Sequence, residues 1–244
     1  MTTDELLAHA CPLIRDNGWA YYFVPETQAK GDELGLELFQ FYVLGRGGVL
    51  GDVEAEVVVS AFGYFSPTLL QPMWDSARQT VAPRDAAHSH FECCAELGRA
   101  RLAQLDGLEA YCAAAGAVND AADSVGLPLY AGFRAEPLVD DLPGRAMQLT
   151  AVLREFRGSA HLMAVRANGL DAKTAHYISR PNDTGMFGWS DDDAPATGPE
   201  QRQAMLAAES LTDDLVRPAY AVLDDAGRQA LAKGIDQIAA ALAP

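Results

Sequence analysis

The chain has 244 residues, of which 49% are hydrophobic and 21% are charged, and its formal net charge is −16. This composition indicates a folded globular protein rather than a disordered one, and no segment approaches the roughly 18 consecutive apolar residues of a membrane-spanning helix. The acidic start of the chain lacks the order of a signal peptide, so a cytoplasmic protein without membrane contacts is expected, and the low Lys and Arg content disfavours tight DNA binding.

Helical signals dominate the first half of the chain. Residues 3–17 begin after a Thr cap, carry acids in the first turn and end before a glycine. An aromatic run then precedes Pro25 and Glu26, and Glu26 is a candidate acceptor for a buried arginine. The glycine-rich residues 45–51 lack the lysine of a phosphate-binding loop and are interpreted as a turn. Further helices are predicted over residues 35–44, 53–62, 83–106 and 108–125.

The chain is expected to be organised around a long, mostly buried helix over residues 144–169. Its apolar positions recur at helical spacing, yet it also contains Arg154, Arg157 and His161, which lie at i, i+3 and i+7 on one face. Buried cations need acceptors. One interpretation is a polar network within the protein, with Glu26 or Glu155 as the acid.

The other interpretation is a pocket for an anionic or polar aromatic small molecule. Bidentate arginines suit a carboxylate or a phosphate, and aromatic rings suit a planar body. In this interpretation His161 is also the candidate catalytic residue, as a general acid or base or as an axial metal or haem ligand. The predicted ligand-binding residues are Arg154, Arg157, His161, Tyr22, Glu26, Tyr64 and Phe65.

The end of the chain predicts winged-helix elements. A helix over residues 200–209, a short hairpin over residues 211–223 and a final amphipathic helix follow the order of such a domain, with the hairpin as the wing. A weak repeat between residues 46–58 and 166–178 supports two units. The predicted fold is mainly α, with tandem winged-helix-like units over residues 1–126 and 144–244, short β-hairpin wings, and a connector over residues 127–143.

Three patches together resemble a known family. Residues 22–26, residues 57–67 and residues 153–158 with His161 are similar to an uncharacterised actinobacterial family described as helix-turn-helix or MarR-like. The resemblance covers most of the chain and implies a helical protein with winged-helix elements, but no established activity. The acid that this family carries two residues before its histidine is absent here, where Ser159 and Ala160 precede His161, and this departure weakens any mechanism that needs a carboxylate there.

A metal site is not predicted among the histidines and cysteines of residues 88–94, and the cofactor, if the protein has one, is left unknown by the sequence. His90 and Cys94 lie one helical turn apart, and His88 and Glu92 share a neighbouring face. No second ligand cluster supports them, however, and buried thiols with solvated histidines are the ordinary content of such a helix.

The leading functional hypothesis is a cytoplasmic small-molecule-binding protein of winged-helix ancestry, for which a homodimer is compatible with the sequence. The alternatives are a MarR-type DNA-binding transcriptional regulator and a secondary-metabolism enzyme that uses His161. For DNA binding, the recognition helix would cover residues 171–179 and present Lys173 and His176, but the acidic residues 191–193 nearby would repel phosphate.

Overall fold

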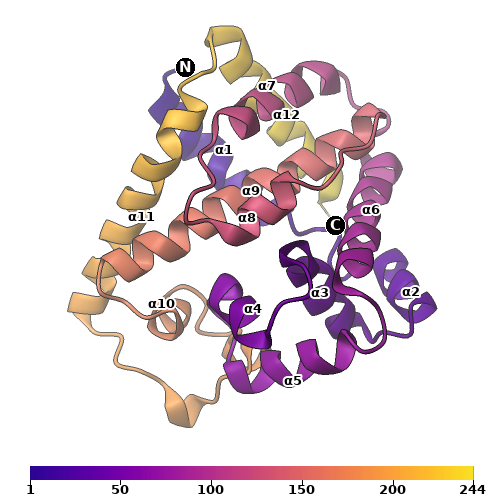
Figure 1. Cartoon of the computed structure of the whole chain (residues 1–244). Helices are drawn as coiled ribbons and strands as arrows, with labels where there is room; N and C mark the ends of the chain where they lie inside the picture. Colours follow the sequence, from indigo (N-terminus) through magenta and orange to yellow (C-terminus); the bar gives the residue numbers. More distant parts are fainter. Residues whose placement is uncertain (244) are drawn as a thin grey trace.

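The computed structural model describes residues 1–243, and all regular secondary structure in this range is helical (Figure 1). The mainly α prediction is therefore correct, and the β-hairpin wings are wrong. The α-helices are α1 (Thr3–Asn17), α2 (Pro25–Glu33), α3 (Leu38–Gly47), α4 (Ala55–Phe62), α5 (Pro67–Ala77), α6 (Pro83–Leu102), α7 (Leu108–Ala121), α8 (Pro128–Arg134), α9 (Leu142–Ala167), α10 (Ala172–Ser179), α11 (Pro199–Tyr220) and α12 (Asp225–Leu242). Short 3-10 turns are η1 (Gly48–Leu50), η2 (Thr184–Phe187) and η3 (Asp191–Asp193).

Of the predicted hairpin over residues 211–223, residues 211–220 are instead the second half of α11, and residues 221–223 lead into α12. Its buried residues, Ala208, Thr212, Val216 and Ala219, recur every three or four positions, which is the period of one helical face. The weak alternation in this stretch is overridden because that face packs against α9. Without a wing, neither of the two predicted units is a winged helix.

Helix α9 occupies the centre of the molecule, as predicted for residues 144–169. It begins where the Asp141 side chain accepts a hydrogen bond from the Gly144 backbone N–H, and it runs for 26 residues. Helices α1, α6, α7, α8 and α11 all pack against it, so α9 crosses the middle of the bundle in Figure 1. Because it has neighbours on several sides, α9 is apolar over most of its circumference.

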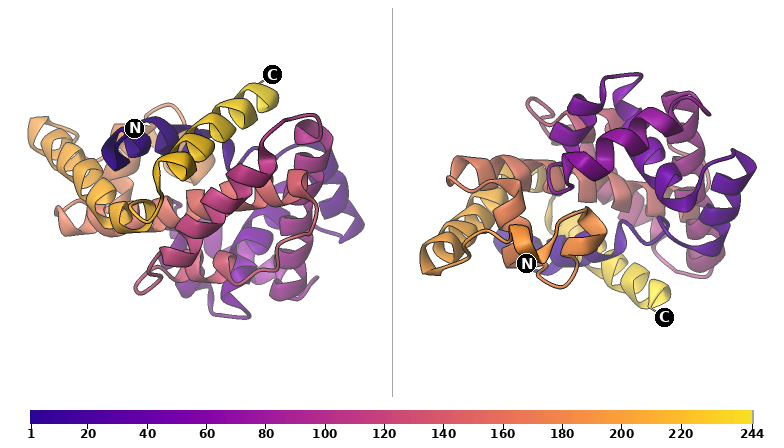
Figure 2. Two further views of the ribbon diagram at one scale, coloured as in Figure 1. Left: turned by 90° about the horizontal axis from the view of Figure 1, so that it is seen from above. Right: turned by 90° about the horizontal axis from the view of Figure 1, so that it is seen from below.

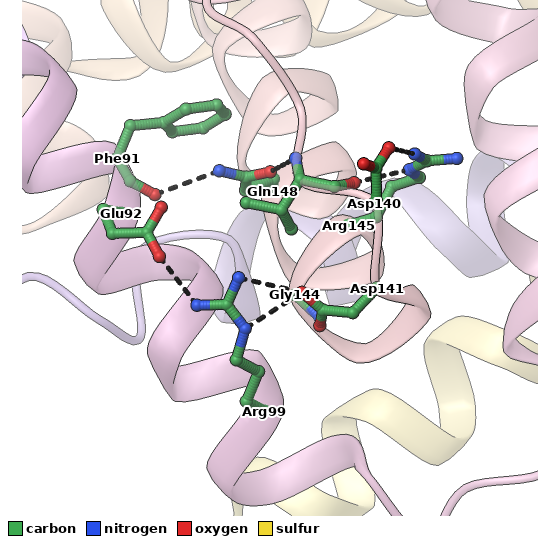
Figure 3. Close-up of polar contacts among 9 residues, drawn as sticks. Phe91, Glu92, Arg99, Asp140, Asp141, Gly144, Arg145 and Gln148 are labelled. Atoms are coloured by element: carbon green, nitrogen blue, oxygen red, sulfur yellow. Dashed lines mark hydrogen bonds and ion pairs between the residues drawn. The ribbon is translucent and has the colours of Figure 1, made fainter.

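Polar contacts attach the start of α9 to α6 (Figure 3). The buried Gln148 side chain donates to the Phe91 backbone oxygen at 3.2 Å and accepts from the Val139 backbone N–H at 2.9 Å. Arg99 of α6 donates from Nε to Asp141 at 2.9 Å. These contacts fix both the segment before α9 and its first two turns.

The main hydrophobic core contains side chains from nearly the whole chain, from Leu6 to Ile238. Helix α12 lies on the outside of the bundle beside α1 (Figure 2). A smaller core, which includes Val165, Leu170 and Met205, joins the end of α9 to α10 and α11. The division into units over residues 1–126 and 144–244 stays a prediction. Within residues 1–243, no helix is both long and apolar enough to cross a membrane.

Candidate functional site

A cavity of about 380 Å³ lies where the turn between α4 and α5 faces the second half of α9, together with α10 and α11. Five arginines and three carboxylates line it, so its wall carries excess positive charge in a chain whose net charge is −16. Aromatic rings form much of the remaining wall. The charged lining residues are Arg15, Arg46, Arg154, Arg157, Arg180, Asp16, Glu155 and Glu209. The lining residues with rings are Tyr42, Phe62, Tyr64, Phe65, Phe187, His161 and His176.

A buried carboxylate, Glu155, organises one side of the cavity. Arg46 donates to it from Nε at 3.0 Å and from Nη2 at 2.8 Å, Arg154 donates from Nη1 at 2.5 Å, and Tyr22 donates from its hydroxyl at 3.1 Å. Burial raises the pKa of Glu155, but the two guanidinium groups outweigh it and lower the pKa to about 2. Two guanidinium groups thus share one carboxylate, and one positive charge is left without a counterion in this cluster.

Arg46 is a functional candidate that the sequence prediction missed. It lies in the last helical turn of α3, whereas residues 45–51 were predicted to be a connecting turn between helices. Its guanidinium lies 4.3 Å from the centre of the Phe62 ring. The three nearby glycines favoured the interpretation as a turn. The signal that would have found Arg46 is its position four residues after Tyr42 on an apolar helix, the same spacing argument that identified Arg154 and Arg157.

A second polar cluster joins α9 to α11. Arg157 donates to Glu209 at 2.8 Å and lies 3.4 Å from Asp213, and His161 Nδ1 lies 2.9 Å from the Thr212 hydroxyl. Burial lowers the pKa of His161, because the imidazolium is poorly solvated there. Burial raises the pKa of Glu209, but the hydrogen bond from Arg157 and the neighbouring positive charges lower it overall.

The structure brings together most of the predicted ligand-binding residues. Arg154, Arg157 and His161 lie on one face of α9 and line the cavity. Tyr64 and Phe65, from the turn between α4 and α5, also line it. Tyr22 lies behind that wall, where it bonds to Arg154 and Glu155. Glu26 is exposed in the first turn of α2, outside the cavity lining. Arg154 uses Glu155, the other acid predicted as an acceptor, and Arg157 uses Glu209. Roles for these residues in ligand binding or catalysis stay predictions.

His90 is a core residue. Its ring packs against Tyr21, Tyr22 and Phe41, and neither ring nitrogen has a hydrogen-bond partner in the described part of the chain. Burial lowers the pKa of His90 to about 3, so the ring is neutral. Cys94 is also buried, and residues 1–243 contain no group of three or more His, Cys, Asp or Glu side chains arranged to hold a metal ion.

One helix pair and one single helix are relevant to DNA contact. Helices α4 and α5 pack together across the turn of residues 63–66, in a helix-turn-helix connection. In α10, the candidate recognition helix, Lys173 lies over the Trp189 ring at 4.8 Å and His176 is buried. The Tyr177 hydroxyl donates to the backbone oxygen of Ser190, so the acidic residues 191–193 do lie beside α10.

The segment between α10 and α11 forms part of the cavity wall. Phe187 stacks on Phe65 with ring centres 4.2 Å apart, and the Phe187 backbone oxygen accepts from the Ser66 N–H at 2.8 Å. Trp189 donates from Nε1 to the Tyr64 backbone oxygen at 2.8 Å. This segment therefore connects the cavity to the turn between α4 and α5.

Comparison with known proteins identifies one family. No curated protein and no solved structure is detectably similar to this chain. The sequence pattern of a family described as a helix-turn-helix family matches residues 17–244, a range that starts at the end of α1 and includes every later helix. Because the match covers nearly the whole sequence, the chain belongs to this helix-turn-helix family.

Proposed function

We propose that this protein binds a small anionic molecule in the cavity lined by Arg154 and Arg157. The observation that carries this proposal is that Arg46 and Arg154 share Glu155 as their only carboxylate partner within residues 1–243. An uncompensated charge in a poorly solvated site is costly, and a bound anion would offset that cost.

The hydrogen-bonding capacity left on the arginines supports the same function. Nε of Arg154 and Nε of Arg157 are buried and have no acceptor in the part of the chain that the structure describes. The remaining atoms of the two side chains keep 20% and 13% of the side-chain surface accessible. Guanidinium groups bind carboxylate and phosphate oxygens in pairs. The neighbouring rings of Phe62, Tyr64 and Phe65 offer apolar contact to a planar body.

Isothermal titration with inorganic phosphate and with phenyl phosphate tests this proposal. We expect both anions to bind, and we expect Arg157→Gln to weaken the binding of each by about tenfold or more, because one charge-assisted hydrogen bond contributes about 1.5–3 kcal/mol. The matched control is Arg99→Gln, which removes an arginine outside the cavity that also pairs with carboxylates. Absence of binding to the wild-type protein, or equal binding by Arg157→Gln, would refute the function.

DNA binding is the second candidate function, and membership of a helix-turn-helix family favours it. Charge opposes it. The described α5 contains neither Lys nor Arg, and Arg78 at its end is paired with Asp52 and Asp75. Because phosphate contacts supply most non-specific affinity, we expect weak binding.

Fluorescence anisotropy with a duplex from the region upstream of the protein's own gene tests this candidate at physiological salt. A Kd in the range of specific complexes, about 10⁻⁸ M or tighter, would make a ligand-responsive transcriptional regulator the leading function. If the protein binds the upstream duplex no more tightly than an unrelated duplex, sequence-specific DNA binding is no longer a candidate function.

A further inference from the structure

We propose that the cavity selects anions that carry their own hydrogen-bond donor, because two acceptors, Nε2 of His161 and Oε1 of Glu209, lie beside Arg157. This inference rests on the proposed function and names the class of ligand. The class comprises hydrogen phosphate, 2-hydroxycarboxylates and the monoanions of phosphate monoesters, whereas sulfate and plain carboxylates are excluded from it.

The tautomer of His161 follows from its partner. The Thr212 hydroxyl has one hydrogen, and it donates that hydrogen to the Ala208 backbone oxygen at 2.7 Å. The His161 Nδ1 atom, 2.9 Å from the same hydroxyl oxygen, must therefore be the donor of that contact. In the neutral ring the proton then sits on Nδ1, and Nε2 presents a lone pair.

Glu209 supplies the second acceptor. Its Oε2 accepts from Arg157 at 2.8 Å, whereas its Oε1 lies 3.8 Å from His161 Nε2, beyond hydrogen-bond distance, and has no donor among residues 1–243. The two side chains meet because His161 follows Arg157 by one turn of α9, while Glu209 precedes Thr212 by one turn of α11. Both acceptors therefore adjoin the same guanidinium.

The charges in this corner determine which anions fit. Arg157 attracts an oxyanion, but an anion without a hydrogen atom would bring its lone pairs against those of Glu209 and His161. Burial lowers the pKa of His161, so near neutral pH the ring does not gain the proton that would turn Nε2 into a donor. A ligand with a P–OH or C–OH group donates its hydrogen to one of the two acceptors while its negative oxygens bind the arginines, and dihydrogen phosphate has a hydrogen for each.

Titration calorimetry at about pH 7 with two matched pairs of anions tests the inference. Phosphate and sulfate are both tetrahedral, but only phosphate carries a proton, and lactate differs from propionate by a hydroxyl group. We expect the donor-bearing member of at least one pair to bind about tenfold more tightly. An anion without a donor would leave the His161 acceptor, whose side chain is 13% exposed, unsatisfied, at a cost of about 1–3 kcal/mol. Tighter binding of phosphate than of sulfate would identify the ligand as a phosphate, and tighter binding of lactate than of propionate would identify it as a hydroxy acid.

The variant Glu209→Gln replaces an acceptor by a group that also donates. We expect it to bind sulfate more tightly than the wild type and to reduce the phosphate preference to about threefold or less. The matched control is Asp214→Asn, which removes the same charge from an exposed residue of α11 that pairs with Arg217 outside the cavity, and its phosphate preference should be unchanged. If circular dichroism shows that Glu209→Gln is unfolded, His161→Phe serves instead and should weaken phosphate without weakening sulfate.

The outcomes separate the inference from the function on which it rests. If both members of each pair bind equally, and Arg157→Gln no longer binds them, the inference is overturned and the proposed anion binding still stands. Failure of all four anions to bind would overturn both. An unaltered phosphate preference in both cavity variants would also overturn the inference, because neither acceptor would then take part.

Discussion

At the scale of single residues, Glu155 joins segments that lie far apart in the sequence. Its partners Tyr22 and Arg46 precede it by 133 and 109 positions, and they come from the start of the chain and from α3. Its side chain is only 2% exposed, so none of these contacts is screened by solvent as a surface ion pair would be. The same carboxylate thus holds the fold together and shapes the cavity.

Replacing this carboxylate by its amide should be strongly destabilising. Glu155→Gln leaves two buried guanidinium groups without a counterion, and we expect a loss of about 3–5 kcal/mol in the free energy of unfolding, measured by urea denaturation. The control is Glu92→Gln, whose partner Arg99 is 40% exposed, and it should cost no more than about 1 kcal/mol. Similar losses in the two variants would show that the buried network contributes little.

His90 should make the protein sensitive to acid. Its pKa is lowered to about 3 in the folded state, against 6.5 for an ordinary histidine, so between these values the unfolded chain binds more protons. The free energy of unfolding therefore rises with pH through this window and gains nothing more from His90 above about pH 6.5, with a slope of at most about 1.4 kcal/mol per pH unit.

The variant His90→Phe keeps an aromatic ring and removes the titration. Urea denaturation of the wild type and the variant should show a smaller rise in stability between about pH 5 and pH 6.5 in the variant. Glu155 does not interfere in this range. Its pKa is lowered to about 2, so the stability that it adds as the pH rises is gained at more acidic pH. Parallel pH profiles would contradict a buried, neutral His90.

At the scale of elements, a glycine sets the contact between α6 and α9. A Cβ atom at Gly98 would overlap the backbone oxygen of Pro143, which belongs to the first turn of α9. We expect Gly98→Ala to cost about 1–3 kcal/mol, because the helices must move apart.

The comparison variant is Gly116→Ala in α7, where nothing lies within 4 Å of the added atom. It should instead stabilise the protein by about 0.5–1 kcal/mol, since alanine favours the helix. Thermal unfolding monitored by circular dichroism measures both changes. Shifts of the same sign in the two variants would contradict close contact between α6 and α9.

Local signals explain which elements could be predicted. The bounds of α1 are predicted correctly because Thr2 and Glu5 form a capping box, and α9 is recognised from its length and apolar density. In contrast, α8 lies in the Pro- and Gly-containing residues 127–143 and is too short to show a period. The hairpin error in α11 arose because two or three alternating residues fit a strand and a helix equally well.

The candidate site was predictable only in part, for a related reason. Helical spacing alone places Arg154, Arg157 and His161 on one face, and that much follows from the sequence. Of their acceptors, Glu155 was one of the two acids predicted, and it does accept from Arg154. Glu209 and Thr212 were not predicted, because they are brought to α9 by the way it meets α11. Tertiary packing of this kind leaves no period in the sequence, which is why the exposed Glu26 was predicted as readily as Glu155.

At the scale of the whole molecule, the continuous core predicts cooperative unfolding. Because the main core includes residues from both predicted units, and α9 contacts helices of each, we expect a single calorimetric transition with equal calorimetric and van't Hoff enthalpies. Two separate transitions would show instead that residues 1–126 and 144–244 unfold independently.

The central position of α9 also has a consequence for the order of synthesis. Helices α1, α6 and α7 leave the ribosome before α9 does, and each buries an apolar face against it. Arg46 likewise emerges 109 residues ahead of the carboxylate that neutralises it. The nascent N-terminal half therefore exposes apolar surface until α9 has been translated, and chains that stop before Leu142 become substrates for chaperones and proteases.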